Sequence, residues 1–114
     1  MGLNSLFYIE ELTGLSVINY SSVILRDEEG RRQYGTMVKL ENEMLAILIE
    51  NSDTSVYFYT FKFKDLFNKK AEPTKSKKYM RTKNKYDKDW DILIPINFYE
   101  KLKDNKKTEG KVIH

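Results

Sequence analysis

The sequence predicts a mainly β domain, in which an N-terminal helix is followed by a five-stranded, bent antiparallel sheet and a short C-terminal helix. Three observations support this fold class. Apolar residues recur at every third position near the N-terminus, runs of β-branched and aromatic residues are separated by short polar turns, and one charged segment precedes the last apolar run. A chain of 114 residues fits one such domain. We place it at residues 1–104 and expect residues 105–114 to form a mobile tail.

The first element is a helix expected over residues 3–13. Leu6, Ile9 and Leu12 repeat at a spacing of three and form one apolar stripe. Gly14 follows directly, where a helix commonly ends on a residue with positive φ. The spacing and the glycine therefore agree on where this helix ends.

The strands are identified by their β-branched and aromatic residues and by the turns between them. The expected strands cover residues 17–26, 31–40, 44–50, 56–64 and 90–96. The run 44–50 is apolar on both faces, which is typical of a central strand. Pro95 lacks an N–H group, so the last strand should lie at an edge of the sheet or end there. Asn97 can cap the short C-terminal helix that follows.

Between the fourth and the last strand, the sequence becomes strongly basic. Nine Lys or Arg and only two acidic residues fall between positions 69 and 88, whereas the whole chain carries a net charge of +3. This composition predicts an enlarged basic loop at about residues 65–89, attached to a mildly acidic body. A strand near positions 79–81 is the one regular element expected within it.

Composition argues against most kinds of catalysis. The chain has no cysteine, and its single histidine is His114, the last residue, so histidine-based triads and zinc sites are not expected. We therefore expect no catalytic residue, no metal site and no cofactor. Asp87, Asp89 and Asp91 alternate before the last strand and leave a metal-dependent nuclease as a third hypothesis. With no signal peptide and no apolar run long enough to span a bilayer, we expect an intracellular protein, cytoplasmic or nuclear.

The stretch from residue 23 to residue 51 carries a recognisable spacing. It contains Val23-Ile24-Leu25, Gly30, Gly35, Thr36-Met37, Leu40, Glu41, Met44 and Ala46-Ile47-Leu48. This pattern resembles the first motif of Sm-like small β-barrels without a gap. Residues 80–84, Met-Arg-Thr-Lys-Asn, are similar to the second motif but lack its glycine. A glycine within a strand also has a physical reason, because it allows a sharp bend or a close backbone approach.

The resemblance implies a ring of identical or related subunits, joined through edge strands, that binds U- or A-rich RNA at its pore. Glu43, Leu45 and Arg81 occupy the positions that hold the base in the family. Glu43 stacks poorly and Leu45 cannot hydrogen-bond a base, so only Arg81 suits its role. We expect the apolar residues 92–96 to add to the sheet of a neighbouring subunit.

The basic segment offers a second route to nucleic acid, through phosphate contacts and aromatic stacking. The expected contact residues are Arg81, Lys77, Lys78, Lys83, Lys85, Tyr79, Tyr86 and Asn84. The leading hypothesis is thus a non-enzymatic, oligomeric RNA-binding module with single-stranded RNA as its partner. The alternatives are a solvated lysine-rich loop, or a small protein–protein interaction or inhibitor protein of viral or mobile-element origin that meets an acidic partner.

Overall fold

The computed structural model describes residues 3–27, 29–50, 56–67, 71–83 and 90–103. Its elements are α1 (Leu3–Thr13), β1 (Val17–Asp27), β2 (Arg32–Leu40), β3 (Met44–Glu50), β4 (Val56–Lys62), α2 (Phe63–Phe67), β5 (Ala71–Pro73), β6 (Tyr79–Lys83), β7 (Trp90–Pro95) and a helix over residues 96–103. Among the described residues, no helix is long and apolar enough to cross a membrane. The expected tail, residues 105–114, lies outside the described residues.

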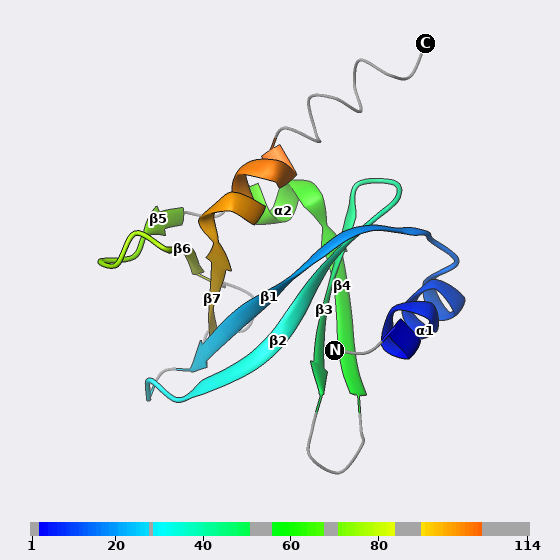
Figure 1. The fold of residues 1–114 in the computed structure, drawn as a ribbon, viewed down its shortest axis with the longest axis horizontal. Helices are drawn as coiled ribbons and strands as arrows, with labels where there is room; N and C mark the ends of the chain where they lie inside the picture. The colour runs from blue at the N-terminus through cyan, green and yellow to red at the C-terminus, as the bar shows by residue number, and fades with distance from the viewer. Residues whose placement is uncertain (1–2, 28, 51–55, 68–70, 84–89, 104–114) are drawn as a thin grey trace.

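One antiparallel sheet of seven strands, in the order β4-β3-β2-β1-β7-β6-β5, curls into a half-barrel (Figure 1). The mainly β class, the antiparallel pairing and the helices at the two ends of the described chain are therefore confirmed. The predicted count of five strands is wrong. Of the two strands beyond those five, β6 confirms the strand expected near positions 79–81 within the basic loop, whereas β5 and the hairpin that it forms with β6 were not expected. Alternation along β6 leaves Thr82 fully buried while Arg81, next to it, faces the other side.

The last strand, β7, lies inside the sheet. Leu93 is opposite Ile24 of β1 on one side and Arg81 of β6 on the other. The prediction that this strand adds to a neighbouring subunit is therefore wrong, because both of its edges are already paired within the chain. The strand does end at Pro95, as a residue without an N–H group requires.

The two faces of the sheet carry separate cores. On the inner face, β1, β3 and β7 pack against α2 and the helix at 96–103, and the central contacts include Leu25, Ile47, Ile94 and Phe98. On the outer face, Leu6 and Ile9 of α1 pack on residues of β2 and β3. A helix is about 10 Å wide and strands lie about 4.8 Å apart, so α1 can cover only part of a seven-stranded sheet. None of the described helices covers the outer face of β1, β7, β6 and β5 (Figure 1).

Gly35 in β2 marks a close approach between strands. It pairs with Val23 of β1, and a Cβ atom at this position would lie 2.9 Å from the backbone carbonyl oxygen of Leu48 in β3. A glycine within a strand predicts a bend or a close backbone approach, and the close approach is confirmed.

Gly35→Ala should lower the free energy of unfolding by about 1–3 kcal/mol, because the added methyl group must push back a backbone atom rather than a flexible side chain. Urea unfolding followed by circular dichroism measures this change. Ser22→Ala, an exposed substitution on the neighbouring strand, should change it by less than about 0.5 kcal/mol. Equal stabilities for the two variants would contradict the close approach.

Candidate nucleic-acid interface

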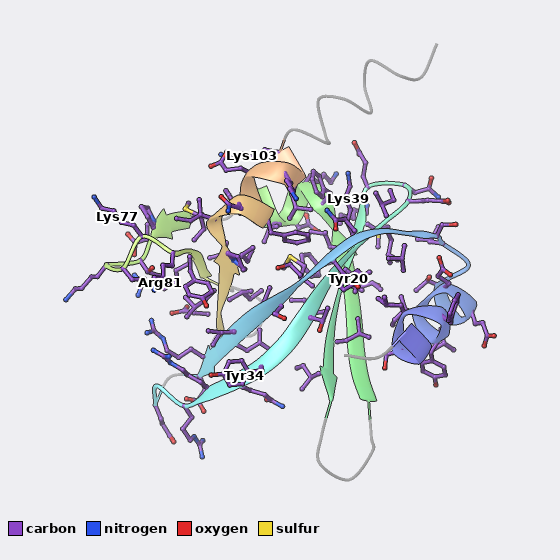
Figure 2. The ribbon with its side chains drawn as sticks, in the orientation of Figure 1. Tyr20, Tyr34, Lys39, Lys77, Arg81 and Lys103 are labelled. Carbon is purple, nitrogen blue, oxygen red and sulfur yellow. The ribbon has the colours of Figure 1, made fainter. Side chains whose placement is uncertain are left out.

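The uncovered half of the outer face forms a hollow of about 850 Å³. It is lined by Ile24, Arg26, Arg32, Glu72, Pro73, Thr74, Lys75, Ser76, Lys78, Tyr79, Arg81 and Leu93, and we call it the basic groove. In Figure 2, Tyr34, Arg81 and Lys77 lie in the half of the molecule away from α1. The groove therefore joins residues of the first hairpin to residues of the basic segment, which are far apart in the sequence.

The strand register explains why these side chains meet. Tyr34, Ile24, Leu93, Arg81 and Glu72 are successive partners across β2, β1, β7, β6 and β5. Residues that are directly opposite on neighbouring strands share one face of a sheet. The five side chains thus form one row perpendicular to the strands, in which Ile24, Leu93, Arg81 and Glu72 line the groove and Tyr34 follows at the β2 end.

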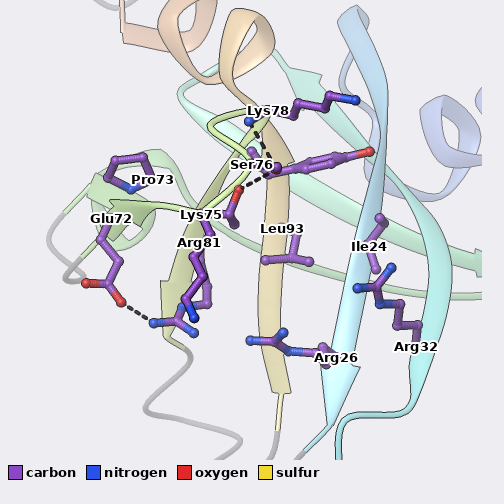
Figure 3. Close-up of a pocket in the computed structure, with 12 residues that line it drawn as sticks. Ile24, Arg26, Arg32, Glu72, Pro73, Lys75, Ser76, Lys78, Arg81 and Leu93 are labelled. Carbon is purple, nitrogen blue, oxygen red and sulfur yellow. Dashed lines mark hydrogen bonds and ion pairs between the residues drawn. The ribbon is translucent and has the colours of Figure 1, made fainter.

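The groove has an apolar floor and charged walls. Ile24 and Leu93 are both buried, and Figure 3 shows Leu93 between Arg81 and Glu72 on one side and Arg26 and Arg32 on the other. At the β2 end of the row, the side chain of Tyr34 is 70% exposed. Such an apolar floor with an exposed ring at its end suits the flat face of a base.

Five of the lining residues are basic and one, Glu72, is acidic. Arg81 forms an ion pair and hydrogen bond with Glu72. Arg26 lies 3.6 Å from the carboxylate of Asp91 on β7. Among the described residues, Arg32 has no carboxylate partner and is exposed. The groove therefore combines paired and unpaired cations, with a surplus of positive charge.

The turn between β5 and β6 holds the lysines in a defined geometry. The Thr74 N–H donates to the carbonyl of Tyr79 and the Lys77 N–H donates to the carbonyl of Thr74, both at 2.9 Å. Lys77 has a φ of 59°, the left-handed conformation that often follows such a turn. The Ile96 N–H donates to the carbonyl of Lys78 at 3.1 Å and joins the turn to the C-terminal helix.

Asp27 orders the hairpin between β1 and β2 at the other end of the groove. Its carboxylate accepts hydrogen bonds from the N–H groups of Glu29 at 3.0 Å and Arg31 at 2.8 Å, and from the Arg31 Nε at 2.9 Å. Desolvation by burial raises the pKa of Asp27, but the hydrogen bonds and charge of Arg31 outweigh it, so this pKa lies below the ordinary value of 3.8. The ionised carboxylate thus stabilises the turn that precedes Arg32.

The structure brings together part of the predicted site. Arg81, Lys78 and Tyr79 line the basic groove, and Lys77 is exposed on its turn without lining it. Lys83 lies in β6, but its side chain is outside the description. The remaining predicted residues, Asn84, Lys85 and Tyr86, lie outside the described residues.

Sequence reasoning missed the half of the groove that β1 and β2 supply. Arg26 and Arg32 are directly opposite each other, and Tyr34 lies two residues further along β2. Alternation along these strands puts all three on the outer face, and that signal is visible in the sequence. Their nearness to Arg81 depends on the pairing of β1 with β7, which no local pattern indicates.

The three positions transferred from the Sm-like resemblance do not come together. Leu45 is fully buried in the inner core, Glu43 lies in the turn between β2 and β3 with a φ of 58°, and Arg81 lines the groove on the outer face. A base cannot contact all three at once. Any contact between Arg81 and RNA must therefore involve the groove residues instead.

The described residues include no group of three His, Cys, Asp or Glu side chains that could hold a metal ion. Of the three aspartates considered as metal ligands, Asp87 and Asp89 lie outside the described residues and Asp91 pairs with Arg26. No protein-family model, curated protein or solved structure matches this chain.

The lowered pKa of Asp27 has a consequence for acid stability. The contribution of Asp27 to the free energy of unfolding should be fully present above its unfolded-state pKa of 3.8. It should be lost as the pH falls through the lower pKa that Asp27 has in the folded protein. In a ¹H–¹⁵N NMR titration, the amide signals of Glu29 and Arg31 should move with a midpoint below 3.8. Asp27→Asn should abolish this movement, while Glu29→Gln should leave it in place. A midpoint at or above 3.8 would contradict the lowered pKa of Asp27.

Proposed function

We propose that this chain is a non-enzymatic, Sm-like module that binds single-stranded RNA along the basic groove. The observation that carries the proposal is the row across five strands, in which Tyr34 and Arg81 flank the apolar floor formed by Ile24 and Leu93. Phosphates would contact the arginines and lysines of the walls, and bases would stack on Tyr34 and Tyr79.

Single strands fit this surface better than duplexes do. A groove that presents tyrosine rings to its ligand needs bases with exposed faces, and the bases of a duplex are already stacked on each other. Tyr34 and Arg81 are separated by three strand spacings, or about 14 Å. Such a span suits contact with more than one nucleotide of an extended strand.

The Sm-like part of the proposal rests on the motif between residues 23 and 51 and on the order of elements. A helix, α1, precedes the meander β1 to β4, and β7 returns to pair with β1. The resemblance implies a preference for U- or A-rich RNA. It also implies assembly through edge strands, for which β4 and β5, at the two ends of the sheet, are the candidates.

A second candidate function is binding to another protein, as an interaction or inhibitor module. The observation that favours it is the outward side of α1, where Phe7, Tyr8 and Leu12 are exposed together. If no oligonucleotide binds at low salt, this function becomes the leading hypothesis and the groove becomes a surface for an acidic partner.

The charges of the groove should set the salt dependence of RNA binding. Arg32→Ala combined with Lys78→Ala should weaken binding and reduce the slope of log affinity against log salt by about 1.4, which corresponds to two lost phosphate contacts. Lys64→Ala combined with Lys101→Ala removes the same charge from α2 and the C-terminal helix, on the other face of the sheet. Fluorescence anisotropy with U-rich, A-rich and mixed oligonucleotides across a salt series measures both pairs. Equal slopes for the two double variants would contradict the groove as the binding face.

The tyrosines should contribute through stacking. Tyr34→Ala and Tyr79→Ala should each weaken binding of a U-rich oligonucleotide by about 1–3 kcal/mol, whereas Tyr34→Phe should retain most of the affinity because its ring still stacks. Tyr8→Ala is the matched control, since Tyr8 is an exposed tyrosine on α1, away from the groove. The same anisotropy assay measures all four variants. Loss of affinity in Tyr8→Ala equal to that in Tyr34→Ala would argue against a specific stacking site.

A further inference from the structure

The arginines of the basic groove differ in how they are held. Arg81 is paired with Glu72, and Arg26 with Asp91 at a longer distance of 3.6 Å. Arg32, together with Lys75 and Lys78, has no carboxylate partner among the described residues. Within the described part of the chain, the groove therefore offers a phosphate cations that no carboxylate pairs with, whereas Arg81 is already paired with a carboxylate of the chain itself.

The position of Glu72 allows its ion pair with Arg81 to open easily. Glu72 lies directly opposite Arg81 in the hairpin, and its side chain is 47% exposed against 29% for Arg81. Exposed ion pairs are weak, because water and salt solvate both partners once they separate. Arg81 can thus remain in place while Glu72 turns outward into solvent.

The strand that carries Glu72 is also the least anchored strand of the sheet. β5 has three residues, lies at the edge, and pairs with β6 alone among the described strands. One of the three is Pro73, which has no N–H group to donate, and Ala71 supplies its contact with the inner core. A small movement of β5 would cost few contacts elsewhere.

We infer that Glu72 neutralises Arg81 in the free protein and is displaced by a phosphate of the bound strand, so that Glu72 limits the affinity of the groove. The inference rests on the function proposed above and adds a competing group to it. A guanidinium can accept a phosphate in place of a carboxylate because both ligands offer two oxygens to its planar N–H groups. Ligands without a phosphate or similar oxyanion cannot make this exchange, which favours a nucleic acid backbone over an uncharged ligand.

The test compares the affinity of a U-rich oligonucleotide for Glu72→Gln and for the original protein by fluorescence anisotropy. Glu72→Gln should bind about three- to tenfold more tightly at low salt, and the gain should shrink as salt rises. Glu29→Gln, which removes the same charge from an exposed carboxylate paired with Arg31, should change the affinity by less than about twofold. In an Arg81→Ala background, the gain from Glu72→Gln should disappear. Provided that the oligonucleotide binds the original protein, a gain that persists there, an equal gain in Glu29→Gln, or no gain at all would overturn the exchange.

A second probe separates this inference from the proposed function. Inorganic pyrophosphate, titrated against the protein, should shift the Arg81 Nε–Hε signal in a ¹H–¹⁵N NMR spectrum at lower concentration in Glu72→Gln than in the original protein. If no oligonucleotide binds but pyrophosphate behaves in this way, the proposed function fails and the exchange stands. If oligonucleotides bind and Glu72→Gln changes neither measurement, the exchange fails and the proposed function stands.

Discussion

The pairing of β1 with β7 is the contact on which the rest of the structure depends. β1 is an eleven-residue strand whose C-terminal part is paired on both sides, with β2 and with β7. The pairing of Ile24 with Leu93 joins the N-terminal meander to the hairpin of β5 and β6. Without this contact the basic segment would lie apart from Arg26 and Arg32, and the C-terminal helix could not complete the inner core. The pairing spans most of the chain, so it forms at a large cost in loop-closure entropy, and apolar residues on both faces of the strands offset that cost.

Unequal coverage of the two faces of the sheet produces the groove. Among the described residues, the inner face packs against two helices, whereas the outer face has only α1, which contacts β2 and β3. The uncovered half must be compatible with water, and most of the side chains around its apolar floor of Ile24 and Leu93 are accordingly charged, or small and polar. The lysine at position 39 shows the opposite arrangement, because it is buried on the inner face with its Nζ 5.2 Å from the centre of the Phe63 ring. Charge alone therefore does not place a residue on the outer face, and the strand alternation decides which side it occupies.

The sequence was sufficient to predict what depends on neighbouring residues. The three-residue spacing of α1, the meander of β1 to β4, the end of β7 at Pro95 and the close approach at Gly35 all follow from local patterns. The strand expected near positions 79–81 is β6, but its hairpin partner β5 was missed, because β5 has only three residues and one of them is a proline. For the site, the basic segment pointed to Arg81, Lys78 and Tyr79, while Arg26, Arg32 and Tyr34 were missed. Their contribution follows from the register between distant strands, and a single sequence carries no direct signal for that register.

The charge arrangement of the groove opposes the stability of the sheet. Arg26 and Arg32 are directly opposite each other on β1 and β2, and like charges in that position destabilise a strand pair. Asp91, opposite Arg26 on its other side, relieves part of this repulsion, and Glu72 does the same for Arg81. Each carboxylate that stabilises the free protein also competes with any anion that enters the groove. Stability of the sheet and affinity for a polyanion are therefore in conflict at these positions, and local rules of sheet formation are commonly broken at functional sites. The same conflict explains why Glu72, which is exposed and lies on an edge strand, is a better place for a displaceable anion than Asp91, which lies on a strand paired on both sides.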